Sequence, residues 1–290
     1  MARGSSLLAL VASACLWACG ETRVTLLEPI LEHEGGSAPV DAAVAGSGGG
    51  SNTSGNGAGD AGAPSNSLPP HLIHRYTFDG EGTRVVDSVG SADGTLMGGA
   101  VLDGAGHVTL DGTDDYVDLP NGLISGLADV TIVAWLAWNG GPCWQRVFDF
   151  GSSDAGEDSV GNATSSLFAT AKRCGNADPE LGPAAAMETT DGILGSVDGH
   201  ARFPELNRAM LAVSVDGKAQ ELSLYAAGKA VGTGKAVPLA RLTDENDWLG
   251  RSQWVQDDHL QGIYDEFRIY DVVLGDAELA AIEAAGPGAL

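Results

Sequence analysis

Two adjacent carboxylates, Asp265 and Glu266, lie in GIYDEFRIYD, a stretch rich in strand-forming residues. Such pairs can be the acid and base of a glycosidase or the ligands of a cation. Successive side chains of a regular strand point to opposite faces, so Asp265 is expected to face the core beside Phe267. Glu266 is expected to face outward in a solvated ion pair with Arg268. The two carboxylates should then not act on one substrate bond.

A core-facing carboxylate must be neutralised, hydrogen-bonded or bound to a cation, because burying it alone is costly. If the last strand pairs antiparallel with HRYTFD, Asp265 comes near Asp79 and the loop that ends at Asp87. Calcium also accepts backbone carbonyl oxygens, which Gly80 or Gly82 could supply. The hypothesis is a structural calcium site at Asp79, Gly82, Asp87 and Asp265. The alternative is that these residues cap turns and accept bonds from backbone amides.

Aromatic side chains could bind sugars where they lie exposed beside polar groups. Trp135 and Trp138 belong to VTIVAWLAW, which is apolar on both faces, so both are expected in the core. Trp144, beside Cys143, and Trp254, in the polar segment RSQWVQDD, are the candidates for a ligand-binding rim. Burial is the alternative for these two as well.

The N-terminus has one positive charge followed by a short apolar run, as in a signal peptide. The segment LWAC resembles a bacterial lipobox and predicts a signal peptide over residues 1–18 with lipidation at Cys19; Cys15 follows a weaker match. A plain secretory signal and an uncleaved anchor are the alternatives. Export would leave Cys143 and Cys174 in an oxidising compartment, which predicts a disulfide; two free buried cysteines are the alternative.

Residues 19–70 comprise the lipidated cysteine and a tether rich in Gly, Ser and Ala, which cannot bury enough apolar surface to fold. Acidic residues outnumber basic ones by 39 to 15, for a formal charge of -24. This charge disfavours nucleic acid and anionic lipid, so membrane contact is expected only through the N-terminal lipid. Gly20 stands where an aspartate would indicate inner-membrane retention, so the expected location is the outer membrane of a Gram-negative-type cell, with surface exposure left open.

Residues 71–286 contain short β-rich runs separated by Asp-Gly, Gly-Gly and Asn-Gly turns, which predicts one all-β domain, an antiparallel β-sandwich. The segment AELAAIEAA predicts one short C-terminal helix, capped by Gly275 or Asp276. The chain is expected to be a monomer.

Several segments of this domain follow a recognisable order: YTFDGEGTRVVDSVGSADGTL, LDGTDDYVDLP, VTIVAWLAW, LSLYAAGKAVGTG, and WLGRSQWVQDDHLQGIYDEFRIYDVVL followed by AELAAI. Together they resemble the laminin G-like jelly rolls of the concanavalin A-like lectin and glucanase superfamily, from Leu72 to Ala284. The resemblance implies two curved sheets packed face to face, with the first and last strands side by side. It also implies binding of glycans or proteins and, in many relatives, a structural calcium ion.

Catalytic motifs do not accompany this pattern. The glucanases of the superfamily carry Glu-x-Asp-x-x-Glu along one strand, and neither Glu157-Asp158 nor Glu245-x-Asp247 fits that spacing. The acidic segment DGTDDY lacks the spacing of an EF-hand loop, and turn chemistry accounts for it. The predicted function is therefore non-catalytic glycan binding by a surface lipoprotein. A protein-binding adhesion or scaffold module is the alternative, and a glycosidase on the same fold comes third.

Overall fold

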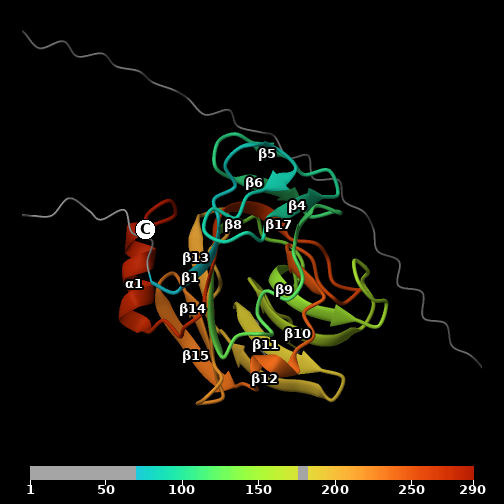
Figure 1. The fold of residues 1–290 in the computed structure, drawn as a ribbon, viewed down its shortest axis with the longest axis vertical. Coiled ribbons are helices and arrows are strands. Elements are labelled where there is room, and N and C mark those ends of the chain that lie inside the picture. Colours follow the sequence, from blue (N-terminus) through green and yellow to red (C-terminus); the bar gives the residue numbers. More distant parts are fainter. Residues whose placement is uncertain (1–69, 176–181) are drawn as a thin grey trace, which may run out of the picture. The chain divides into compact units, whose positions relative to one another are not determined.

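The computed structural model describes residues 70–175 and 182–290 (Figure 1). The predicted signal peptide, both candidate lipidation residues, Cys15 and Cys19, and the tether up to Pro69 lie outside the described residues. No helix in the described ranges is both long enough and apolar enough to span a bilayer.

Two antiparallel sheets make up most of the domain, as expected from the spacing of the β-rich runs. The first sheet has seven strands in the order β1-β17-β8-β13-β14-β15, with β6 also paired to β17. Its strands are β1 (Leu72–Tyr76), β6 (Val108–Asp111), β8 (Asp129–Trp138), β13 (Ala209–Asp216), β14 (Glu221–Ala226), β15 (Lys229–Lys235) and β17 (Gln261–Tyr270).

The second sheet has eight strands in the order β12-β11-β10-β9-β16-β7-β4-β3. They are β3 (Arg84–Val85), β4 (Gly94–Met97), β7 (Tyr116–Leu119), β9 (Arg146–Ser153), β10 (Ala163–Thr170), β11 (Ala184–Thr189), β12 (Gly192–Asp198) and β16 (Asn246–Leu249). Strands β2 (Glu81–Gly82) and β5 (Leu102–Asp103) form a separate pair, and one short 3-10 helix spans Leu239–Arg241.

The hydrophobic core fills the space between the two sheets. Phe148 and Phe150 of β9 contact Phe267 of β17, with ring centroids 6.2 and 6.0 Å apart. The Tyr264 hydroxyl of β17 donates a hydrogen bond to the Val147 carbonyl of β9, at 2.6 Å. Burying aromatic side chains of this size is the main stabilising contribution to a sandwich.

The C-terminal helix α1 (Asp276–Ala285) packs beside the seven-stranded sheet (Figure 1). Its Leu279 is buried in a second apolar cluster that includes Trp135, on the outer side of that sheet. The Gly275 amide donates to the Glu278 carboxylate at 2.8 Å, so the expected N-terminus of the helix is confirmed. Trp135 and Trp138 are both buried, as expected.

The first and last strands lie side by side, as the resemblance implied. Strand β1 pairs antiparallel with β17, with Tyr76 opposite Phe267. Strand β17 contains an irregularity that the sequence did not predict: Tyr264 pairs with Leu136 and Glu266 pairs with Trp135, so Asp265 is an extra, unpaired residue. A bulge of this kind reverses the alternation of side chains beyond it.

Candidate functional site

The two tryptophans predicted to bind ligand lie together on the outer face of the eight-stranded sheet. Trp144 belongs to the connection between β8 and β9, and Trp254 to the connection between β16 and β17. Both are partly exposed and line one hollow of about 210 Å³. We call it the tryptophan hollow; its other lining residues are Arg146, Phe168, Glu188, Ile193, Gln256 and Asp257.

Trp144 is held by a disulfide and by the backbone around it. Cys143 and Cys174 are bonded, with Cα atoms 5.4 Å apart, which confirms the expected pairing. The Trp144 amide donates to the Lys172 carbonyl at 2.8 Å, beside the bridge. Trp144 has a φ of 68°, a left-handed conformation that is strained for a bulky residue and needs such support.

Trp254 is fixed through its ring nitrogen. The indole Nε1–H donates to the Glu188 carboxylate of β11 at 2.7 Å. The Trp254 amide donates to the Ser252 hydroxyl at 3.1 Å, and Trp254 forms a β-bridge with Gly161. The indole therefore keeps one orientation while part of its surface remains accessible.

Arg146 of β9 lines the same hollow and contacts Trp144. Its guanidinium carbon lies 3.9 Å from the centre of the Phe168 ring and 5.7 Å from that of Trp144. It forms ion pairs with Asp257 at 2.9 Å and Asp149 at 3.2 Å. A nearly buried arginine with two carboxylate partners has little capacity left for an anionic ligand.

Burial raises the pKa values of carboxyl groups in and next to the tryptophan hollow. Burial raises the pKa of Glu188, and the hydrogen bond from Trp254 offsets only part of that rise. Burial also raises the pKa of Asp257 and of Asp149, in each case against the lowering effect of Arg146. Asp149 accepts hydrogen bonds from the Ser166 hydroxyl and from the Gln253 amide, which ties the loop that carries Trp254 to β9.

Asp79 and Asp265 line one hollow, but among the described residues the four predicted calcium ligands do not form a group whose ligand atoms lie close enough to share a metal ion. The Asp87 carboxylate accepts hydrogen bonds from the amides of Arg75, Val89, Gly90 and Ala92, and contacts His74 Nδ1 at 2.7 Å. Burial alone would raise the pKa of Asp87, but these hydrogen bonds hold it below its ordinary value. Asp87 thus organises a turn, which was the alternative to metal binding.

The other predicted calcium ligands have separate roles. Gly82 lies in β2, opposite Leu102. Asp79 accepts a hydrogen bond from the Thr77 hydroxyl at 2.6 Å. Asp265 is paired with Arg208, whose Nε lies 2.6 Å from one carboxylate oxygen while its second nitrogen bonds the other. A carboxylate already held by a two-pronged guanidinium is a poor ligand for a cation.

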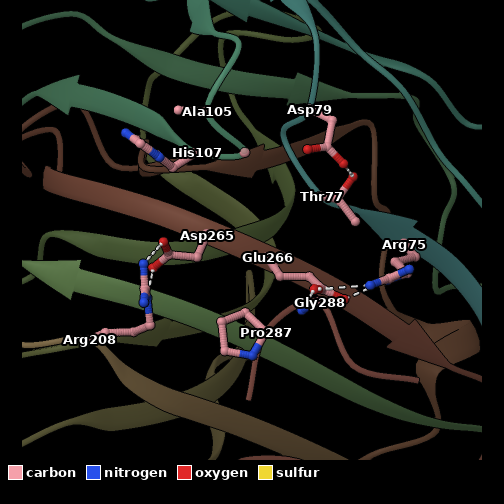
Figure 2. Close-up of a pocket in the computed structure, with 11 residues that line it drawn as sticks. Arg75, Thr77, Asp79, Ala105, His107, Arg208, Asp265, Glu266, Pro287 and Gly288 are labelled. Carbon is pink, nitrogen blue, oxygen red and sulfur yellow. Dashed lines mark hydrogen bonds and ion pairs between the residues drawn. The ribbon is translucent and has the colours of Figure 1, made fainter. Parts of the chain in front are cut away.

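The expectation that alternation separates Asp265 from Glu266 is wrong, because of the bulge at Asp265. Both carboxylates line one polar hollow on the seven-stranded sheet, as Figure 2 shows. Glu266 is buried rather than solvated and bonds both Arg75 and Arg268. Burial would raise the pKa of Glu266, but the two arginines hold it below its ordinary value.

A different acidic group has the geometry to hold a metal ion. Among the described residues, the carboxylates of Asp111, Asp114 and Asp115 offer ligand atoms that lie within 4.8 Å of one another. The turn chemistry expected for this segment is also present, because the Asp111 amide donates to Asp115 and the Thr113 amide to Asp111.

Six residues that line the tryptophan hollow were not predicted from the sequence: Arg146, Phe168, Glu188, Ile193, Gln256 and Asp257. Glu188 belongs to AAAMET, an alanine-rich segment with little strand propensity, so its strand was not expected. The signal that could have indicated Arg146 is its place in CWQRVFDF, two residues after the candidate Trp144 and close to Cys143.

The two packed antiparallel sheets define a lectin-type β-sandwich. A family profile described as the concanavalin A-like lectin/glucanases superfamily matches residues 111–280, more than half of the sequence, so the chain belongs to this superfamily. A comparison with curated proteins gave no match.

Three solved structures illustrate the range of proteins that share the fold. Domain 4 of AbnA, a GH43 extracellular arabinanase from Geobacillus stearothermophilus, in complex with arabinotriose, has a TM-score of 0.56 at 19% identity, over 72% of this chain and 97% of that chain. The binding domain of botulinum neurotoxin DC in complex with rat synaptotagmin II has a TM-score of 0.53 at 11% identity, over 74% of this chain and 51% of that chain. Trypanosoma rangeli sialidase has a TM-score of 0.52 at 14% identity, over 73% of this chain and 32% of that chain.

At such low sequence identities, the structural similarity establishes a common fold and nothing more. This chain spans about half of the neurotoxin domain and about a third of the sialidase. The fold therefore occurs both in a toxin's binding domain and within enzymes.

Proposed function

We propose that the chain is a non-catalytic saccharide-binding module and that the tryptophan hollow is its sugar site. The observation that carries the proposal is the convergence of Trp144 and Trp254, from two separate connections, on one hollow with polar neighbours. Indole faces pack on the apolar faces of sugar rings, carboxylates accept hydrogen bonds from sugar hydroxyls, and side-chain amides both donate and accept them. The arabinotriose complex of a similarly folded domain supports a sugar as ligand.

The charges of the hollow favour a neutral saccharide. Glu188 and Asp257 line it, and the positive charge of Arg146 is already shared between Asp257 and Asp149. A carboxylated or sulfated sugar would bring negative charge to these groups and to a chain with a formal charge of -24.

The test is a printed array of neutral, acidic and amino-sugar oligosaccharides, probed with the full-length chain. Binding to neutral sugars is expected, and Trp254→Ala should weaken it at least about tenfold, because an aromatic anchor in a hollow is worth about 2 kcal/mol. Val255→Ala is the matched control, because Val255 is 62% exposed and does not line the hollow. Equal binding by the two variants would overturn the assignment of the site.

A protein partner is the second candidate, and the exposure of Ile193 favours it. Ile193 lines the hollow with 67% of its surface exposed, as expected for a side chain that a protein partner covers. The similarly folded neurotoxin domain is bound to synaptotagmin. An array without any signal would favour this candidate, and Ile193→Asp should then abolish binding to cells that the wild-type chain labels.

A glycosidase is the third candidate, because two carboxyl groups with raised pKa values, Glu188 and Asp257, line the same hollow. A general acid needs a raised pKa of this kind. Each carboxyl group is already engaged, Glu188 by Trp254 and Asp257 by Arg146, which favours a positioning role. Hydrolysis of an array sugar that is lost in Glu188→Gln would identify an enzyme.

The proposed cellular context is an exported lipoprotein attached through Cys19, with the tether between the lipid and the binding domain. It rests on the lipobox-like segment and on the composition of residues 19–70. Calcium is the proposed occupant of the group formed by Asp111, Asp114 and Asp115, because carboxylate oxygens are its preferred ligands. Addition of calcium to the EDTA-treated chain should then raise the melting temperature, and Asp115→Asn should remove that response.

A further inference from the structure

A second hollow, separate from the tryptophans, lies on the outer face of the seven-stranded sheet. It has a volume of about 460 Å³, within the size range of about 300–1,000 Å³ typical of ligand pockets. Its floor is β17, and the loop between β5 and β6 and the C-terminal residues Pro287 and Gly288 form its walls (Figure 2). We call it the polar hollow.

The bulge in β17 creates the floor of the polar hollow. Because Asp265 has no partner in β8, it and Glu266 both turn outward, whereas Tyr264 and Phe267 lie in the core on either side of them. A regular strand would place only one of the two carboxylates on this face. The irregularity thus brings two acidic groups to one surface.

Each floor carboxylate is held in place by an arginine at the edge of the hollow. Two guanidinium nitrogens of Arg208 donate hydrogen bonds to the Asp265 carboxylate. Two nitrogens of Arg75 donate to the Glu266 carboxylate, at 2.6 and 3.3 Å. The Gly288 amide also donates to Glu266. The Arg75–Glu266 pair is largely buried, whereas the Arg208 side chain is exposed. Ion pairs of either kind contribute little net stability, so they are weak evidence of a purely structural role.

The upper edge of the polar hollow offers a further acceptor. Asp79 is exposed and receives one hydrogen bond from the Thr77 hydroxyl, at 2.6 Å (Figure 2). Its other oxygen lies 3.2 Å from the position that a Cβ on Gly106 would occupy. The absence of a side chain at Gly106 keeps this side of the hollow open.

The hydrogen-bonding groups that line the polar hollow indicate which class of ligand it would bind. Acceptors (Asp79, Asp265) alternate with donors (Arg75, Arg208), and each has capacity beyond its existing partner. A hydroxyl group both donates and accepts, so neighbouring hydroxyls of a sugar ring can bond both kinds of group. An apolar ligand would remove water from these charged groups without offering them hydrogen bonds.

We propose that the polar hollow is a second saccharide site, which acts independently of the tryptophan hollow. The two sites lie on different sheets, so one chain could hold two sugar chains, or two parts of one polysaccharide. Two linked contacts can raise overall avidity by about 10²- to 10⁴-fold when both engage the same ligand.

The test uses the full-length chain with Trp144→Ala and Trp254→Ala combined, so that the first site is disabled. On a printed array of neutral, acidic and amino-sugar oligosaccharides, this double variant is expected to keep binding to a subset of the sugars. Adding Asp79→Asn or Arg208→Lys should reduce that residual binding at least about tenfold, because each removes hydrogen bonds to a charged group.

Glu245→Gln is the matched control, because Glu245 is an exposed acid that lines neither hollow. The Arg208→Lys variant keeps a positive charge for Asp265, and equal melting temperatures for Asp79→Asn and the control show that the fold is intact. Loss of all array binding in the double tryptophan variant would overturn the second site while leaving the first. Residual binding that Asp79→Asn and Arg208→Lys leave unchanged would overturn it as well.

Discussion

Asp265 and Arg208 form an ion pair in which the two partners differ greatly in exposure. The Asp265 side chain is 6% exposed and that of Arg208 is 56% exposed. Removing the carboxylate leaves an arginine that water can solvate, whereas removing the arginine leaves a buried charge without its partner. The two truncations should therefore have unequal costs.

We predict that Asp265→Ala lowers the free energy of unfolding by about 1–3 kcal/mol, and that Arg208→Ala lowers it more. Denaturant unfolding with and without calcium is the measurement. The cost of Asp265→Ala should be the same in both conditions, because the structure pairs this residue with an arginine. A cost that appears only in the presence of calcium would contradict this assignment.

Some residues of the two hollows could be predicted from the sequence and others could not, for physical reasons. Trp144 and Trp254 were recognisable because each is an aromatic residue in a polar or cysteine-containing connection. The faces of Asp265 and Glu266 were not, because the bulge depends on how β17 pairs with β8, which is a tertiary property. Glu188 was missed because only its contact with Trp254 indicates its role.

The connection between β8 and β9 links the disulfide to the tryptophan hollow. The Cys143–Cys174 bridge lies next to Trp144, whose left-handed backbone needs support. A bridge with a sequence separation of 31 residues contributes about 3.5 kcal/mol by the chain-entropy estimate. The bridge should thus affect both the stability and the binding site.

We expect the double variant Cys143→Ser/Cys174→Ser to melt at a lower temperature and to bind array sugars at least about fivefold more weakly. Because the bridge lies at one edge of the sandwich, near-UV circular dichroism should still report a packed core. To separate the two effects, binding is measured well below the melting temperature. Unchanged affinity in a destabilised variant would show that Trp144 does not depend on the bridge.

At the level of elements, the central strands of the seven-stranded sheet were predictable, and one edge of the eight-stranded sheet was not. β8, β13 and β17 are runs of apolar and β-branched residues, so composition alone indicates them. β11 and β12 contain alanine and glycine instead, and they are defined by their pairing, β11 with β10 and β12 with β11. This hairpin supplies Glu188 and Ile193 to the tryptophan hollow.

Over the whole molecule, buried carboxyl groups make stability depend on pH in two opposite ways. Burial raises the pKa of Asp149, Glu188, Asp247 and Asp257, so protonating them as the pH falls stabilises the folded state. Asp87 and Glu266 have lowered pKa values. Their contribution is present above the unfolded pKa of about 4 and is lost as the pH falls through the folded pKa.

The melting temperature should therefore be higher at about pH 5.5 than at about pH 7.5, and should fall steeply below about pH 4. Asp247 is fully buried with one oxygen unpaired among the described residues, and burial raises its pKa, so it is expected to contribute to the first effect. In Asp247→Asn, the rise between pH 7.5 and 5.5 should be smaller than in the wild type. A melting temperature that falls steadily from pH 7.5 to 5.5 would contradict this account.

The proposed anchor predicts where the whole chain resides. Cys19→Ala should release the protein from the membrane fraction into the soluble envelope fraction, because lipidation needs the cysteine thiol. Cys15→Ala is the matched control and should leave the distribution unchanged. Fractionation followed by immunoblotting measures both, and membrane association of the Cys19→Ala chain would show that another feature anchors it.

The central claim is that the tryptophan hollow binds a sugar. Its most direct test is the affinity of the full-length chain for its best array saccharide, measured by titration calorimetry for the wild type, Trp254→Ala and Val255→Ala. Trp254→Ala is expected to bind the saccharide at least about tenfold more weakly than the wild type, and Val255→Ala is expected to bind it like the wild type. Equal affinities for all three proteins would contradict it.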